Sequence, residues 1–209
     1  MSFVPPISNQ PQQVEPVQRN KTIERAKEAI AKKARSRLVA DESSKEVIVE
    51  GVREGIRFSL SGRLLFPTGT ANLTPEGQKV LDSIAISLAE FPDLRIRIEG
   101  HTDSNPIPPG SIYRDNWRLS QARALSTLIY LRDQVSPPEN RIQENRFSIM
   151  ACAEVRPRFP NDTPENRSLN RRVEIVLLQG QNSEAITGVL EGTKETRVNP
   201  EESDYTPLK

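Results

Sequence analysis

Residues 94–131 read LRIRIEGHTDSNPIPPGSIYRDNWRLSQARALSTLIYL. Residues 94–99 alternate apolar and charged side chains, which predicts a half-buried strand. Gly100 lets the chain turn sharply as it leaves this strand, and a polar loop with prolines runs to about Asn116. A helix follows, and the residues expected to point mostly inward from it are Leu119, Ala122, Leu125, Leu128, Ile129 and Leu131. The flanking segments are interpreted relative to this strand, loop and helix.

The segments before residue 94 predict two strands and a helix. Residues 47–52 and 56–60 are strand-like and flank a turn at Glu54-Gly55. Thr74 is the expected N-cap of the helix that follows, with Pro75 at its first position. The buried face of this helix is expected to comprise Val80, Leu81, Ile84, Leu88 and Phe91. Pro92 then ends the helix.

The segments after residue 131 predict two more strands. Residues 146–151 form one strand, and residues 171–178 form the last, with Val173, Ile175 and Leu177 on one face. A turn with a short helical start precedes the first of these strands, and a loop with prolines lies between the two. Strands and helices in this arrangement are typical of an α+β fold that buries one face of a sheet under two helices.

Both ends of the chain differ in composition from this core. Residues 1–20 are rich in proline and glutamine and predict a disordered leader. Residues 181–209 predict a flexible acidic tail. Residues 21–46 predict a basic amphipathic helix and linker before the domain at 47–180. The narrow apolar stripe of this helix leaves two interpretations open: a solvated helix, or a surface for a partner helix or an acidic membrane.

Composition excludes several classes of function. The 209 residues carry a net charge of +1, which gives no electrostatic case for binding nucleic acid. One cysteine cannot form an intrachain disulfide, and one cysteine with one histidine makes a zinc site built from these residue types unexpected, so we predict no metal or cofactor. No apolar run approaches the roughly 20 residues that span a bilayer, and no signal peptide is visible. We therefore expect a soluble chain, or the soluble part of a longer protein.

The polar loop places charged residues near the end of a strand. Asp103 follows the strand closely, and Arg123 lies about two turns into the next helix. The last strand begins at Asn170, Arg171 and Arg172, which converge on the loop if the two strands are neighbours. An acid beside an arginine predicts either a structural salt bridge or a site for a zwitterion. In the second case the ligand ammonium meets the carboxylate and the ligand carboxylate meets the guanidinium.

Three motifs in this order resemble the OmpA-like peptidoglycan-binding domain: IEGHTDSNPI, NWRLSQARALSTLIYL and NDTPENRSLNRRVEIVL. The similarity covers about residues 56–180, and the long loop before Asn116 together with its NW pair resembles the MotB branch. The resemblance implies an OmpA-like β/α/β/α/β sandwich with a mixed sheet covered by helices on one face. It also implies noncovalent peptidoglycan binding in the periplasm. One departure is that Ala151 and Ala153 replace the glycines of a Gly-x-Gly element that the family often has.

The resemblance also assigns site residues. Asp103 corresponds to the family's binding aspartate and Arg123 to its binding arginine, and the pair is expected to hold the diaminopimelate of a peptidoglycan stem peptide. Arg171 or Arg172 is expected to meet the carboxylates of the ligand, and Thr102 to assist by hydrogen bonding. The residues expected to shape the same pocket are Asn116, Leu119 and Ser120.

The MotB branch further implies a role as the periplasmic part of a flagellar motor stator. That role brings a homodimer, a MotA-type partner subunit, and a transmembrane segment outside this sequence that anchors the full-length protein in the inner membrane. The basic helix at 21–46 then belongs to the linker or plug region. The alternative within the family is the wall anchor of another envelope machine, such as a type VI secretion system or a Pal-like protein.

An enzyme is the competing class of function. A wall hydrolase would use His101 and Asp103 for acid–base chemistry. No recognisable motif places a nucleophile, so we assign no catalytic residue and expect a protein that is not an enzyme. We expect His101 to be a loop residue that is hydrogen-bonded within the scaffold.

Overall fold

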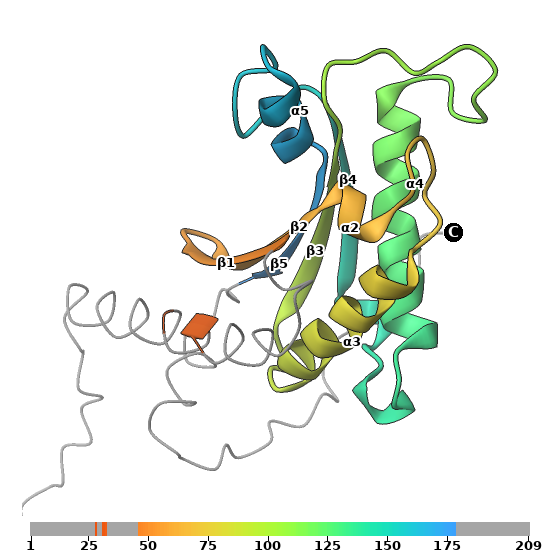
Figure 1. The fold of residues 1–209 in the computed structure, drawn as a ribbon. Coiled ribbons are helices and arrows are strands. Elements are labelled where there is room, and N and C mark those ends of the chain that lie inside the picture. The colour runs from red at the N-terminus through yellow and green to blue at the C-terminus, as the bar shows by residue number, and fades with distance from the viewer. Residues whose placement is uncertain (1–27, 29–30, 33–45, 179–209) are drawn as a thin grey trace, which may run out of the picture.

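The fold is known from a computed structural model, which describes Glu28, Ala31, Lys32 and residues 46–178 (Figure 1). The predicted leader at 1–20, the tail at 181–209 and most of the basic helix at 21–46 lie outside the described residues. Glu28, Ala31 and Lys32 have helical backbone, and Ala31 is buried as part of the hydrophobic core. No helix among the described residues is long and apolar enough to cross a membrane.

Five strands form one mixed sheet in the order β1-β2-β5-β3-β4. Only the pair β3 and β4 is parallel among the pairs in this sheet, and the others are antiparallel. The predicted α+β class and mixed sheet are therefore confirmed, as is the adjacency of the last strand to the strand that precedes the polar loop. The strands are β1 (Val47–Val52), β2 (Gly55–Ser61), β3 (Arg95–His101), β4 (Phe147–Ala153) and β5 (Arg172–Leu178).

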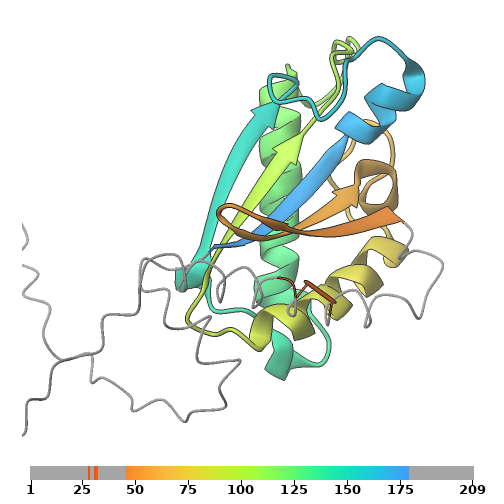
Figure 2. The same ribbon diagram turned by 90° about the vertical axis from the view of Figure 1, so that its left-hand side faces the viewer.

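Two long helices, α3 (Pro75–Ala89) and α4 (Asn116–Ile129), cover one face of the sheet (Figure 1). The short helix α5 (Pro164–Asn170) lies at the same end of the sheet as the loop between β3 and α4, as both views show (Figure 2). Between α3, α4 and the sheet lies a core of buried aliphatic and aromatic side chains. The remaining short elements are α2 (Gly62–Leu65), η2 (Tyr130–Gln134), η3 (Pro138–Asn140) and η4 (Glu144–Arg146).

The start and the buried face of α3 agree with the prediction. The Thr74 hydroxyl accepts a hydrogen bond from the Gly77 amide, and Pro75 is the first helical residue. This cap satisfies one of the amides that a helix start leaves without an intrahelical partner. The side chains predicted to face the core are all buried, namely Val80, Leu81, Ile84, Leu88 and Phe91.

The buried face of α4 differs from the prediction. Leu125 is 42% exposed, whereas Ser120, Arg123 and Thr127 are buried. These polar side chains can turn inward because each has a partner: the Ser120 and Thr127 hydroxyls bond to carbonyls of their own helix, and Arg123 bonds to a distant loop. A prediction from apolar side chains alone therefore placed the inward face of α4 about one residue away from the face that the structure buries.

The loop predicted between the last two strands contains the helix α5. Thr163 accepts a hydrogen bond from the Asn166 amide, and Pro164 occupies the first helical position. This is the same Thr-Pro start as in α3, and it is a sequence signal for a helix that the prolines elsewhere in the segment obscured. The strand predicted at 146–151 begins one residue later and ends two residues later, at Phe147–Ala153.

We expect Arg146→Ala to lower the free energy of unfolding by about 3 kcal/mol, because charged hydrogen bonds to buried carbonyls are lost together. The Arg146 guanidinium is buried and donates to the carbonyls of Leu88, Phe91 and Leu94, at distances of 3.1, 2.7 and 2.9 Å. It thereby satisfies carbonyls at and beyond the C-terminal end of α3. Urea unfolding measures the change. Arg132→Ala is the control, since its exposed ion pairs should contribute less than about 1 kcal/mol; equal losses would contradict this role.

Candidate functional site

The site lies where the β3–α4 loop, the N-terminal half of α4, the loop after α2 and the start of β5 meet. Gly100 near the end of β3 makes this meeting possible. A Cβ atom at this position would lie 2.0 Å from the Ser120 carbonyl oxygen, so any side chain would push α4 away from β3. The requirement for glycine is therefore a close approach of two backbones. That approach fixes the distance between the loop after β3 and the side chains of α4.

Arg171 and Asn105 donate hydrogen bonds to the Asp103 carboxylate. Its Oδ2 accepts from Arg171 Nη1 at 2.5 Å and from Asn105 Nδ2 at 3.3 Å. Its Oδ1 accepts from the Asn105 amide at 3.1 Å. The Asp103 side chain is 7% exposed, whereas the Arg171 side chain is 38% exposed. The salt bridge in this structure therefore joins Asp103 to Arg171, not to Arg123.

Arg123 approaches the same group of charges from α4. Its Nε donates to the Thr70 carbonyl at 2.9 Å, and the centre of its guanidinium lies 5.2 Å from the centroid of the Phe66 ring. Burial lowers the pKa of Arg123 to about 10; Tyr113 and Asp103 act to raise the pKa, and Arg171 acts to lower it. The guanidinium is thus charged at neutral pH. Within residues 46–178 it has no salt bridge to a carboxylate, so its charge remains available for a ligand.

Asn116 connects the loop to the start of α4. Its Nδ2 donates to the carbonyls of Asp103 and Asn105, at 3.3 and 3.1 Å. One side-chain amide therefore holds the turn that carries Asp103. Leu119 is buried one turn below and contributes packing.

Thr102 and Ser120 support the floor of the site. The Thr102 amide donates to the Ala153 carbonyl at 2.8 Å, and the Ser120 hydroxyl accepts from the Ala153 amide at 3.2 Å. Both residues are buried. Their observed role is to tie β3, β4 and α4 together beneath the charged groups. The Thr102 hydroxyl is itself buried and has no hydrogen-bond partner within the described part of the chain.

Arg172 does not join Arg171 beside Asp103. Its guanidinium is buried and donates to Glu174 Oε1 at 2.6 Å and to the carbonyls of Asn170 and Arg156. Of the two arginines between which the sequence left a choice, the structure brings Arg171 to Asp103 and Arg172 to an ion pair on the sheet.

Residues 65–171 match the OmpA family. The chain belongs to this family. Motility protein B of Bacillus subtilis is 33% identical over 125 residues, a match that covers 60% of this chain and 46% of that protein. The chain spans about half the length of the curated relatives that it matches.

Two solved structures share this OmpA-family fold. A MotB-like protein from Desulfovibrio vulgaris has a TM-score of 0.67 and 26% identity, and the match covers 77% of this chain and 98% of that one. The cell wall anchor of the type VI secretion system from Pseudomonas aeruginosa has a TM-score of 0.59 and 29% identity, covering 68% of this chain and 94% of that one. Both therefore resemble this OmpA-family domain at the level of the whole fold.

Ala153 marks the departure of this OmpA-family domain from the Gly-x-Gly element. Its φ is +43°, in the left-handed region that alanine adopts at a cost of about 1–2 kcal/mol. We expect Ala153→Gly to stabilise the domain by at most about 1 kcal/mol, because glycine removes this strain but gains entropy when unfolded. Thermal and urea unfolding measure the difference. The matched variant Ala151→Gly should destabilise β4, since no positive φ is relieved there; stabilisation by it alone would contradict the argument.

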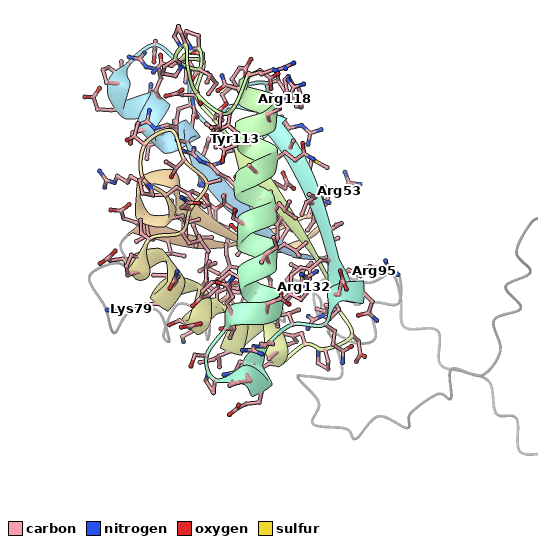
Figure 3. The ribbon with its side chains drawn as sticks, turned by 90° about the vertical axis from the view of Figure 1, so that its right-hand side faces the viewer. Arg53, Lys79, Arg95, Tyr113, Arg118 and Arg132 are labelled. Atoms are coloured by element: carbon pink, nitrogen blue, oxygen red, sulfur yellow. The ribbon has the colours of Figure 1, made fainter. Side chains whose placement is uncertain are left out.

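Four residues of the site were not predicted. Phe66 and Thr70 come from the loop after α2, and Asn105 and Tyr113 come from the β3–α4 loop. Figure 3 shows Tyr113 beside the first turns of α4. The length and polarity of the loop gave a signal for the last two. Phe66 and Thr70 have no local signal, because only the folded chain brings the loop after α2 to Arg123.

His101 and Asp103, the two residues considered for acid–base catalysis, lie beside different partners. His101 Nε2 lies 3.6 Å from Glu99 Oε2, and Asp103 bonds to Arg171. His101 is also a buried residue at the end of β3, not a loop residue. Neither of its ring nitrogens has a hydrogen bond within the described ranges, so the expectation of a hydrogen-bonded scaffold histidine was wrong.

Proposed function

We propose that this OmpA-family domain binds peptidoglycan noncovalently through the charged end of a stem peptide. The observation that carries the proposal is the convergence of one carboxylate and two guanidiniums, from Asp103, Arg123 and Arg171, at one end of the sheet. A ligand that carries both an ammonium and carboxylates can pair with this carboxylate and these guanidiniums.

Diaminopimelate presents these groups on one carbon atom. In the proposed complex its ammonium donates to Asp103, and its carboxylate accepts from Arg123 and Arg171. The salt bridge between Asp103 and Arg171 has a role in this scheme, because it keeps both charges compensated until the ligand replaces each partner. Arg123 is held by Thr70 and Phe66, so its orientation costs little entropy on binding.

Noncovalent wall binding makes the domain an anchor for a complex of the cell envelope. We favour the periplasmic part of a MotB-type stator, with a homodimer, a MotA-type partner and an inner-membrane anchor outside this sequence. The similarity to Motility protein B and to the MotB-like structure supports this choice. The likeness to the type VI wall anchor keeps a second envelope machine as the alternative.

A sacculus pull-down tests peptidoglycan binding. We expect the protein to sediment with purified sacculi and a diaminopimelate-containing peptide to release it in competition. Protein that stays in the supernatant would contradict the proposal. Release of soluble muropeptides from the sacculi would instead identify a hydrolase.

The stator role needs a separate test in the source organism. If this chain is part of a stator, deletion of the gene that encodes it is expected to leave flagella in place but abolish swimming. Normal swimming after deletion would exclude the stator role and favour the wall anchor of another machine, while leaving peptidoglycan binding intact.

A further inference from the structure

Three potential metal ligands meet on the face of the sheet that is turned away from α3 and α4. Glu99 and His101 lie two residues apart on β3, so both point to this face, whereas Ile98 belongs to the core under the helices. Cys152 lies on the neighbouring strand β4. All three side chains are buried: Glu99 is 6% exposed, His101 2% and Cys152 1%. None of them belongs to the proposed peptide site.

An irregularity in the sheet brings Cys152 to the other two residues. Gly100 pairs with Ala151, but the next residue, His101, pairs with Ala153. Cys152 is therefore the extra residue of a bulge between the two strands. Bulges re-aim side chains and recur beside functional sites. Here the bulge turns the thiol toward the carboxylate of Glu99.

The donor atoms lie almost close enough together to share one metal ion. Glu99 Oε2 lies 3.6 Å from His101 Nε2 and 3.8 Å from Cys152 Sγ. All three donor atoms lie within 4.8 Å of one another. Metal–ligand bonds of about 2.0–2.3 Å in tetrahedral geometry place neighbouring ligand atoms roughly 3.3–3.7 Å apart. Only small side-chain adjustments therefore separate this arrangement from a coordination sphere.

His101 supplies an independent reason to look for a ligand. Both of its ring nitrogens are buried and lack a hydrogen bond among the residues described here. A buried polar group without a partner costs free energy, and native proteins seldom leave one in that state. The 3.6 Å separation from Glu99 is too long for a hydrogen bond. A metal ion between the two groups would give Nε2 the partner that it lacks.

The two carboxylate oxygens of Glu99 have different partners: Arg97 binds Oε1, and the Cys152 thiol donates to Oε2. Arg97 Nε donates to Glu99 Oε1 at 2.7 Å, so Oε2 faces the histidine and the thiol. Arg172, the other nearby arginine of the sheet, pairs with Glu174, and Arg156 points its Nη1 at the Met150 sulfur. The Glu99 carboxylate therefore presents Oε2 to the histidine and the thiol.

We propose that Glu99, His101 and Cys152 form a site for a divalent transition-metal ion of the zinc type. Their oxygen, nitrogen and sulfur donors suit a borderline-soft ion such as Zn²⁺ and not Mg²⁺ or Ca²⁺. On binding, the Cys152 thiol releases its proton to solvent and the sulfur forms the metal bond, while no group is oxidised or reduced. A water completes the fourth position. The sequence argument against zinc considered only histidine and cysteine and therefore omitted the third ligand, Glu99.

Titration of the tag-free, chelator-treated 209-residue chain with Co²⁺ tests the site. Co²⁺ serves as a spectroscopic substitute for Zn²⁺, and we expect one equivalent to produce a thiolate-to-cobalt charge-transfer band and intense tetrahedral d–d bands. The chain has one cysteine and one histidine, so the charge-transfer band can come only from Cys152. Added Zn²⁺ should remove both sets of bands. A wild-type spectrum that stays that of hydrated Co²⁺ would overturn the proposal.

Two variants assign the ligands. Cys152→Ser should abolish the charge-transfer band, and His101→Gln should weaken binding at least ~10-fold. A variant that fails to fold is recognised by circular dichroism. In that case the wild-type protein still decides: Zn²⁺, but not Mg²⁺, should raise its melting temperature, and a chelator should reverse the rise. Absence of a Zn²⁺-specific rise, or a charge-transfer band that survives in Cys152→Ser, would refute the site.

Discussion

Arg123→Ala is expected to weaken binding to peptidoglycan sacculi by about 10–1000-fold, because a charged hydrogen-bonded contact to the ligand is worth a few kcal/mol. The guanidinium is buried, oriented by Thr70 and Phe66, and not neutralised by a carboxylate in the described part of the chain. Quantitative co-sedimentation measures the loss. Arg118→Ala is the matched control, since Arg118 lies on the same helix but is exposed and pairs with Asp115.

Asp103→Asn should produce a loss of similar size, because it removes the charge that meets the ligand ammonium but keeps the shape of the side chain. Asp162→Asn is its exposed control. Arg171→Ala should also weaken binding, whereas any effect of Arg172→Ala should appear as lost stability. Circular dichroism separates the two kinds of effect. If the variants at Asp103 and Arg123 both bind like the wild type, the assigned site is wrong.

The second large effect is expected from Gly100→Ala. The new methyl carbon would lie 2.0 Å from the Ser120 carbonyl oxygen, and neither backbone can yield without moving α4 off β3. We expect the free energy of unfolding to fall by at least ~3 kcal/mol, the upper end of overpacking effects. Wall binding should be lost with it, because this approach positions Asp103 relative to Arg123.

Gly110→Ala distinguishes this steric effect from a general cost of replacing glycine. Gly110 has a positive φ of 84°, but nothing lies within 4 Å of the Cβ that alanine would add. Its replacement should cost only about 1 kcal/mol of left-handed strain. Urea unfolding of both variants makes the comparison. Equal losses at the two glycines would contradict the close-approach argument.

Periodic segments explain how much of the fold is visible in the sequence. The alternation in residues 94–99 and the Thr-Pro start of α3 are local patterns, and the structure confirms both elements. The inward face of α4 is not local in this sense. Ser120, Arg123 and Thr127 turn inward only because carbonyls of the folded chain satisfy them. The pattern of apolar residues therefore selected Leu125, which the structure exposes.

The candidate site, like the fold, could be predicted from the sequence only in part. Asp103 and Arg123 lie in motifs, and the structure brings their charges close enough to influence each other. The choice between Arg171 and Arg172 depends on strand register, since a shift of one residue reverses the face to which a side chain points. The sequence alone therefore could not show that Arg171 is the partner of Asp103. The same holds for Cys152, whose position beside Glu99 depends on a bulge.

Calorimetric titration with two soluble stem peptides tests the central claim most directly. One peptide ends in diaminopimelate, and the other ends in lysine and so lacks the second carboxylate. We predict one-to-one binding of the diaminopimelate peptide and at least ~10-fold weaker binding of the lysine peptide, because the carboxylate partner of Arg123 and Arg171 is missing. No binding of the diaminopimelate peptide, or equal affinity for the two peptides, would contradict a site built to hold a zwitterion.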